Sequence, residues 1–265
     1  MTETPSNRQV PPSPDEIEVS ILGPGFGECV LIHPGAGRWL IIDSCIDATT
    51  KRPVLMSALS PSDEMITRAQ EEIALQYRVC KQSEQVTMLT PVQPNHISVA
   101  LHLEVGGRRI LLGSDLEETG DPQIGWSAVL SSVGRPDASA SVFKVAHHGA
   151  QSGHSDAVWT EMVEPKPLAL LTPFRWGRCR LPDANDRRRI LALTDRAFIT
   201  AHPERDIAPR KRTSKVEQMI ARTARKRWVA AGSLGHVRWR ADLLQVDDAG
   251  SIDLFGAAML LGNVA

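Results

Sequence analysis

Residues 95–118 read NHISVALHLEVGGRRILLGSDLEE, and residues 141–155 read SVFKVAHHGAQSGHS. In each stretch an apolar run typical of a buried strand ends in polar residues, Asp115 in the first and His147 and His148 in the second. Ligands of open α/β folds gather at the carboxyl ends of the strands. We therefore expect these polar side chains to meet at one edge of a sheet.

The N-terminal part repeats this arrangement, because the run WLII is followed directly by Asp43. Carboxylates and imidazoles at one edge have the chemistry of a divalent metal site. Each residue alone has an ordinary explanation, since a terminal aspartate commonly forms a turn or caps a helix. A histidine pair is likewise more often on the surface or hydrogen-bonded in a core. The shared placement is what favours a site.

Composition places the chain among globular proteins. It has 265 residues, a net charge of -1 and 42% hydrophobic residues, values that are ordinary for such proteins. The four cysteines are widely spaced, which argues against a disulfide framework and for a reducing, cytoplasmic location. We find no leader sequence and no apolar run of about 18 residues, so neither secretion nor membrane contact is predicted.

The order of the predicted elements indicates one α/β domain over residues 16–265, preceded by a disordered proline-rich tail at 1–15. Three short strands open the domain, and a helix follows at about 62–77. The rest alternates strands with helices. The later strands are expected at 97–105, 109–112, 142–146, 168–172, 197–200, 236–240 and 252–255, and the later helices near 125–132, 156–163 and 184–193. Gly106 and Gly107 are a hairpin signal between the first two of those strands.

The motifs resemble the metallo-β-lactamase-fold hydrolase superfamily. The opening EVSILGPGFGECVLIHPGAGRWLIIDSC is similar to its first strands, and the two stretches quoted above are similar to its second half. The closest pattern is that of the metallohydrolase domain of competence DNA-internalisation proteins: Asn-x-x-Ser, a hairpin, Gly-x-Asp, and Lys-Val-x-His-His-Gly. The later segment LALLTPFRWG fits the next strand of such proteins. The resemblance implies an αββα sandwich.

The resemblance also implies roles for individual residues. Asp115 corresponds to a metal-binding carboxylate, and His147 or His148 to the last histidine ligand; the sequence leaves open which. Asp43 corresponds to an aspartate that orients a ligand. Asn95 and Ser98, from the Asn-x-x-Ser pattern, are expected to support the ligands without binding metal. We expect Asp115 and His148 to be catalytic, with a bound Zn, Mn or Fe ion activating water.

One large departure accompanies this resemblance. The superfamily's His-x-His-x-Asp-His motif is absent, and no two of the eight histidines have the His-x-His spacing. A central block is missing between about residues 47 and 60, which predicts an incomplete first half of the fold. A hydrolytic zinc site generally has three protein ligands, so we expect at most one weakly held ion. His96, His33 and His154 are further candidate ligands, although packed histidines are commoner. His96 and His102 are an even number of residues apart, so on one strand they would share a face.

Two functions follow from these observations. The first is a metal-dependent hydrolase that cleaves an ester, amide or phosphodiester with metal-activated water. The second is a degenerate, non-catalytic family member that acts as a binding scaffold. The missing block also predicts an exposed apolar surface or strand edge, and hence self-association or low solubility. A serine hydrolase at Ser152 is not favoured, because no Gly-x-Ser-x-Gly elbow is present.

A basic segment over residues 203–228 is the remaining candidate for a partner. Lysine and arginine at this density neutralise phosphates in nucleic-acid-binding proteins. A solvated helix face is the more common explanation for such a run, and the overall charge is near zero. The residues that would contact nucleic acid are Arg210, Lys211, Arg212, Arg225, Lys226 and Arg227.

Overall fold

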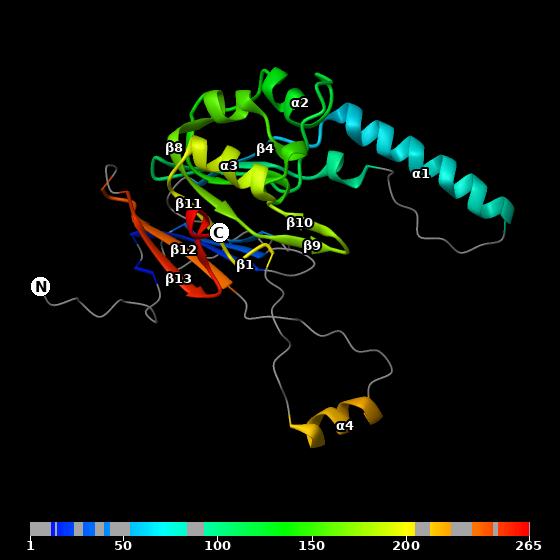
Figure 1. Cartoon of the computed structure of the whole chain (residues 1–265). Coiled ribbons are helices and arrows are strands. Elements are labelled where there is room, and N and C mark those ends of the chain that lie inside the picture. Colours follow the sequence, from blue (N-terminus) through cyan, green and yellow to red (C-terminus); the bar gives the residue numbers. More distant parts are fainter. Residues whose placement is uncertain are drawn as a thin grey trace, which may run out of the picture.

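Two β-sheets packed face to face form the body of the protein in its computed structural model, with helices on the far side of one sheet (Figure 1). The structure describes residues 12–13, 15–23, 29–34, 40–42, 54–83, 93–204, 213–223, 235–245 and 249–264. The protein is therefore a mixed α/β protein, as predicted. Most of the tail at 1–15 and half of the basic segment at 203–228 lie outside the described residues.

The first sheet has five antiparallel strands in the order β13–β12–β1–β2–β3. Its strands alternate apolar and polar residues, so that one face packs on the core and the other does not. In β1, for example, Ile17, Val19 and Ile21 are fully buried in the core between the sheets. The bounds are β1 Glu16–Gly23, β2 Cys29–His33, β3 Leu40–Ile42, β12 Gly235–Asp242 and β13 Ser251–Gly256.

The second sheet has seven strands in the order β14–β11–β8–β7–β6–β5–β4. The hairpin between β5 and β6 forms at Gly106 and Gly107, which both have positive φ, as predicted. The neighbouring strands β6, β7, β8 and β11 are parallel, so their carboxyl ends lie at one edge. The bounds are β4 Val54–Ala58, β5 Leu101–Val105, β6 Arg108–Leu112, β7 Ala140–Lys144, β8 Val163–Leu171, β11 Ala197–Ile199 and β14 Met259–Leu260.

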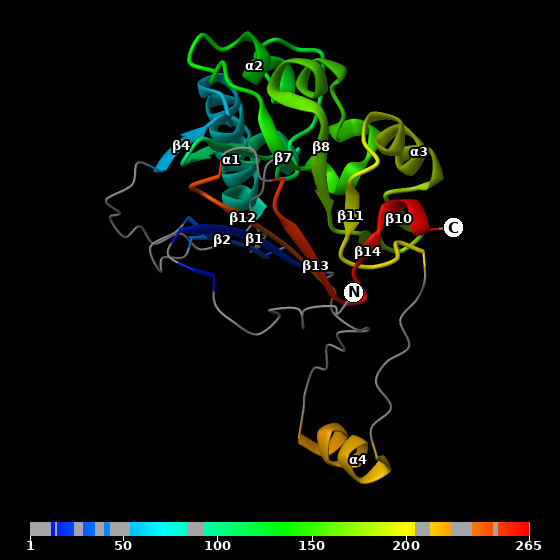
Figure 2. The same cartoon turned by 90° about the vertical axis from the view of Figure 1, so that its left-hand side faces the viewer.

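Helices cover the outer face of the seven-stranded sheet, where Figure 2 shows α2 and α3. This second core packs Phe143 of β7 against Trp159, with ring centroids 5.1 Å apart. Trp159 belongs to a π-helical turn, Val158–Met162, where the sequence predicted an ordinary helix. The two covering α-helices are α2 Gly125–Ser131 and α3 Ala184–Leu193. Asp183 caps α3, because its carboxylate accepts hydrogen bonds from the amides of the first turn.

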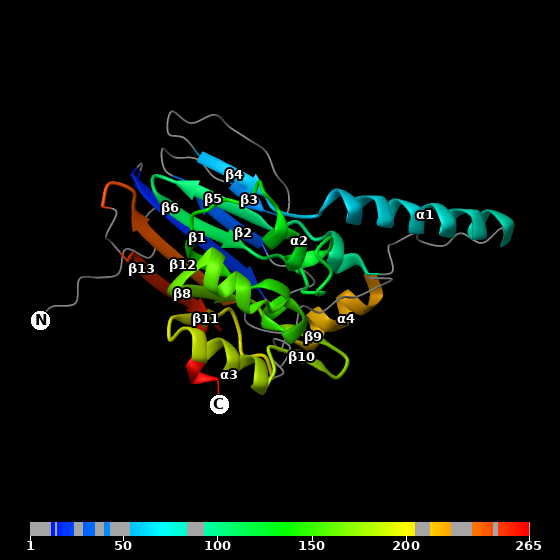
Figure 3. The ribbon, with the colours of Figure 1, turned by 90° about the horizontal axis from the view of Figure 1, so that it is seen from above.

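Helix α1, Asp63–Ser83, packs on the body only near its start and then projects from it (Figure 3). Met65 and Ala69 are buried, whereas Leu75 and Val79 further along are more than half exposed. Strand β4, which was not predicted, precedes the helix and forms one edge of the seven-stranded sheet. Its Leu55 is 60% exposed. Within the described residues, exposed apolar surface therefore occurs at α1 and β4, and β4 pairs with a strand on one side only.

Helix α4, Ser214–Thr223, lies apart from both sheets in two perpendicular views (Figures 1 and 2). It lies inside the basic segment, and its Val216 and Met219 are exposed. None of the helices in the described ranges is both long enough and apolar enough to cross a membrane.

The strand predicted at 97–105 begins later than expected. Residues Pro94–Ile97 form a 3-10 turn, and β5 starts at Leu101. The expectation that His96 and His102 share one strand face is therefore wrong, because Pro94 begins a turn that holds His96 before the strand. His102 is buried in β5 with its Nε2 3.1 Å from the Ala138 carbonyl, and burial lowers its pKa.

Candidate functional site

The candidate site lies at the carboxyl edge of the parallel strands, where three strand ends meet. Asp115 comes three residues after the end of β6, and His148 comes four residues after the end of β7. Thr172 follows β8 directly. Because β6, β7 and β8 are parallel neighbours, these residues are brought to the same edge, as the sequence predicted.

Asp115 and His148 face each other. His148 Nε2 lies 3.5 Å from Asp115 Oδ1. The other ring nitrogen, Nδ1, lies 3.1 Å from the Thr172 carbonyl, which can only accept a hydrogen bond, so Nδ1 carries the proton. The imidazole side chain is 12% exposed and the carboxylate 42% exposed. The pair therefore joins a fixed, mostly buried ring to a carboxylate that is open to solvent.

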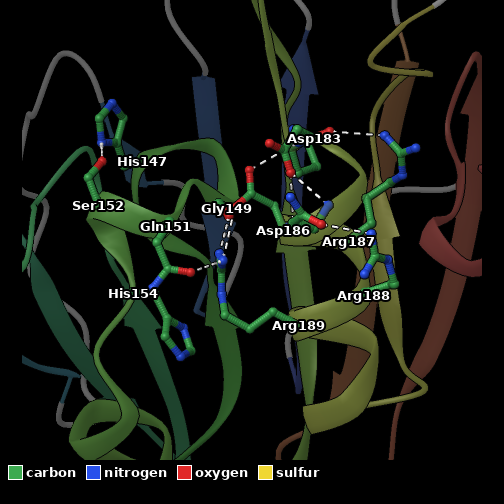
Figure 4. A network of polar contacts seen from close by, with 12 residues as sticks. His147, Gly149, Gln151, Ser152, His154, Asp183, Asp186, Arg187, Arg188 and Arg189 are labelled. Carbon is green, nitrogen blue, oxygen red and sulfur yellow. Dashed lines mark hydrogen bonds and ion pairs between the residues drawn. The ribbon is translucent and has the colours of Figure 1, made fainter.

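His147 faces a different group of side chains, although it is the next residue along the chain. Its Nδ1 lies 3.0 Å from Glu117 Oε1 and 3.0 Å from the Ser152 hydroxyl (Figure 4). Its Nε2 lies 3.4 Å from the Asn95 side-chain amide. His148 therefore pairs with Asp115, and His147 with Glu117.

Glu117 is the residue that sequence analysis missed. Its carboxylate lies between two imidazoles, because Oε2 is 3.4 Å from His96 Nε2 while Oε1 faces His147. Its side chain is 17% exposed. Asn95, which was expected to support the site, also reaches Glu117, at 3.4 Å. The available signal was the position of Glu117, two residues after Asp115 in a loop that already held one candidate.

Ser152 does not complete a catalytic triad. In such triads the nucleophile and the acid contact opposite nitrogens of the histidine. Here Ser152 and Glu117 both contact Nδ1 of His147. The serine-hydrolase interpretation, already disfavoured by the sequence, has no geometric support.

The loop that carries both histidines has an unusual backbone. His147 and His148 have φ values of 45° and 55°, and Ser114, which precedes Asp115, has 48°. The left-handed region is disfavoured for residues with a side chain. Three such residues in two facing loops mean that surrounding contacts hold the backbone against its own preference, which is typical of functional sites.

Helix α3 anchors the far side of this loop, as Figure 4 shows. Arg189 donates to the Gly149 carbonyl at 2.7 Å and to Asp186 at 2.9 Å. Gly149 has a positive φ of 80°, and an added Cβ would lie 2.9 Å from Ile190 of the same helix. The loop is therefore both hydrogen-bonded to α3 and packed closely against it.

The remaining predicted residues do not join the pair. Ser98 contributes backbone contacts, since its carbonyl accepts a hydrogen bond from Ser60 at 2.6 Å. Of the other candidate histidines, His33 contacts the Glu16 carbonyl, and His154 pairs with Asp156 at 3.0 Å. Burial lowers the pKa of His154. Asp43 and residues 47–53 of the block at 47–60 fall outside the described residues. So do the six basic residues predicted to contact nucleic acid, Arg210, Lys211, Arg212, Arg225, Lys226 and Arg227.

Metal ligands are limited in number at this edge. Within the described part of the chain, no group of three or more histidine, cysteine, aspartate or glutamate side chains is arranged to hold a metal ion. Asp115 and His148 are therefore a pair of candidate ligands without a third from those residues. Comparison of the chain with protein-family models, curated proteins and solved structures finds no match.

Proposed function

We propose that this protein is a cytoplasmic, metal-dependent hydrolase with a metallo-β-lactamase-like αββα fold, and that one divalent ion binds at Asp115 and His148. The fold proposal is supported by two sheets that share a core, by helices on the outer face of the second sheet, and by motif residues at its carboxyl edge. The alternative is a non-catalytic scaffold of the same fold.

The pairing of Asp115 with His148 carries the proposal. Two ligands of a tetrahedral ion, each 2.0–2.2 Å from it, lie about 3.4 Å apart. The observed separation of 3.5 Å matches this value. Metal-binding histidines also commonly donate their other ring N–H to a backbone carbonyl, which fixes the tautomer. His148 does so toward Thr172, and its Nε2 therefore faces Asp115 in the form that binds metal.

The residues present fit one ion better than two. A mononuclear site can use Asp115 and His148 and complete its coordination with water or substrate. A dinuclear site needs a larger donor set than the described residues supply. Zinc, manganese and iron all accept imidazole and carboxylate ligands. With two protein ligands in place of the usual three, we expect weak binding.

When bound, a divalent ion would supply Lewis-acid polarisation of a scissile carbonyl or phosphoryl group and would lower the pKa of water. The chain's own residues would do the remaining work. Thr172 holds His148 in one tautomer. Asp115, being 42% exposed, leaves the site open to substrate. Glu117 lies at hydrogen-bond distance from His147, in the loop that also carries His148.

Calorimetric titration of Zn²⁺ and Mn²⁺ into chelator-treated full-length protein tests the proposal. We expect one site per chain. Asp115→Asn and His148→Gln should each weaken binding at least about tenfold, because removal of a supporting residue alone has effects of that size. Hydrolysis of p-nitrophenyl acetate, nitrocefin and bis(p-nitrophenyl) phosphate by the loaded protein covers the ester, amide and phosphodiester classes.

The pair His154 and Asp156 provides a matched control. Its atoms are closer together, at 3.0 Å, yet neither residue belongs to the Gly-x-Asp or the Lys-Val-x-His-His-Gly pattern. Asp156→Asn should leave the metal affinity unchanged. Equal metal binding by Asp115→Asn and the wild type would overturn the proposed site. Metal binding without turnover of any of the three substrates would instead favour the scaffold.

A further inference from the structure

A buried lysine contacts the loop that carries Asp115. Lys144 is the last residue of β7 and is 1% exposed. Val142, two residues earlier, packs in the core between the two sheets, and residues two apart share a strand face. The side chain of Lys144 therefore enters the space between the sheets. Its Nζ donates to the Ser114 carbonyl at 3.4 Å.

The Ser114 carbonyl connects the two loops of the site. It also accepts a hydrogen bond from the backbone N–H of His147, at 2.9 Å. The backbone of Lys144 makes a further link, because its carbonyl accepts from the Gly113 N–H at 2.9 Å. Lys144 thus holds residues 113 and 114 through both its backbone and its side chain. Ser114 directly precedes Asp115, and His147 directly precedes His148.

Backbone strain makes these links necessary. Ser114, His147 and His148 are all in the left-handed region, which isolated residues of these types avoid by about 1–2 kcal/mol each. Such a conformation persists only where the surroundings determine it. The contacts at the Ser114 carbonyl tie two of the three residues together. They therefore control the relative positions of Asp115 and His148.

We propose that Lys144 is a positioning residue, whose amine fixes the Ser114 carbonyl and thereby sets the spacing of Asp115 and His148. The inference rests on the proposed metal site, but the contact it depends on exists without metal. Lys144 need not touch the ion or the substrate. Its effect is transmitted through the backbone of the two loops.

Amide hydrogen exchange of the metal-free, full-length protein tests the contact itself. Lys144→Met should increase the exchange rate of the His147 amide about tenfold, because the carbonyl that accepts from it is no longer held. The urea midpoint of global unfolding should not fall. Lys144→Gln keeps an N–H donor and should show a smaller increase. Lys166→Met, at an exposed lysine of β8, is the control and should change neither quantity.

Metal titration of the same variants tests the consequence. Lys144→Met should weaken Zn²⁺ binding about 10–100-fold, the range found when supporting residues of metal sites are removed. An unchanged His147 exchange rate would overturn the inference, as would loss of folding in both Lys144 variants. If the wild type binds no metal, the proposed function fails; an accelerated His147 amide would then still support the positioning role of Lys144.

Discussion

Two clusters of charged side chains among the described residues are built in different ways. One is the outward face of the five-stranded sheet, where Glu18, Arg238, Arg240 and Asp253 form what we call the sheet-face cluster. The other is the carboxyl edge of the seven-stranded sheet, with Asp115 and its neighbours. In the first, Arg240 contacts Glu18 at 2.6 Å, and strand register already places these residues opposite each other.

Strand register explains the sheet-face cluster completely. Arg238 and Asp253 are also directly opposite in adjacent strands and contact at 2.6 Å. Opposite charges at paired positions are an ordinary means of stabilising a sheet. The edge differs, because its loops place His147, His148 and Ser114 in left-handed conformations. Local preference does not explain that arrangement, so the edge is the better candidate for function.

The largest expected loss of stability comes from breaking the ion pair between Arg240 and Glu18 in the sheet-face cluster. Arg240→Met should lower the free energy of unfolding by about 3–5 kcal/mol, because it leaves Glu18 buried without its ion-pair partner. Both side chains are only 6% exposed, so solvent cannot replace the lost contact. Urea unfolding measures the change. Metal binding should not change, since the cluster lies on the other sheet.

The double variant Glu18→Leu, Arg240→Met separates two explanations of that loss. If the loss comes from the unpaired carboxylate, the double variant should recover most of the stability, because buried ion pairs are often replaceable by apolar residues. A double variant as unstable as Arg240→Met would show that the pair itself stabilises the sheet. A loss of metal affinity in either variant would contradict the separation of the two clusters.

Local sequence signals predicted much of this structure. The helix at 184–193 and the turn at Gly106 and Gly107 agree with the structure, because capping and turn preferences act within a few residues. That Asp115 and His148 lie close together was predictable, because each follows the end of one of two parallel strands. All of these features depend on short stretches of chain.

Long-range contacts were harder to predict. Glu117 and His96 are 21 residues apart and meet only because a 3-10 turn at Pro94–Ile97 brings His96 to the edge. Strand β4 was missed because its five residues show little alternation, and it forms by pairing with β5. The backbone strain at His147 also depends on contacts with Ser114, in a loop more than thirty residues earlier.

A smaller change in stability is expected at the carboxyl edge, where Ser114 has a left-handed backbone. Ser114→Gly should raise the free energy of unfolding by about 0.5–1 kcal/mol, because glycine adopts positive φ without steric cost but loses more entropy on folding. It should also weaken Zn²⁺ binding about tenfold, since the loop that carries Asp115 is less constrained. Thermal unfolding and calorimetry measure the two effects.

Lys166 supplies the matched control for this variant. It also has a positive φ, 54°, but it is exposed on β8 away from the edge. Lys166→Gly should stabilise the protein by a similar amount and leave metal affinity unchanged. Equal effects of the two variants on metal affinity would mean that strain at Ser114 has no connection with the site.

The last effect concerns the pH dependence of stability at His236, which neighbours the sheet-face cluster. His236 of β12 stacks on Phe255, with ring centroids 5.0 Å apart, and its Nε2 is buried without a hydrogen-bond partner among the described residues. Burial, and then the charge of Arg238, lower its pKa below the usual 6.5, against smaller opposing effects of Glu18 and Asp253. The folded protein therefore favours the neutral ring more strongly than the unfolded chain does.

This difference gives the pH dependence a definite sign. As pH falls below about 6.5, the unfolded chain binds a proton that folded His236 resists, so stability decreases until the pH passes below the lowered pKa. His236→Phe keeps a stacked ring that cannot be charged. The variant should match or exceed the wild type at pH 8 and gain on it toward pH 5, by at most about 1.4 kcal/mol per pH unit. Urea unfolding at both pH values measures this gain. A gain no larger at pH 5 than at pH 8 would show that His236 titrates alike in the folded and unfolded chain, and that burial on this face does not disfavour its charged form.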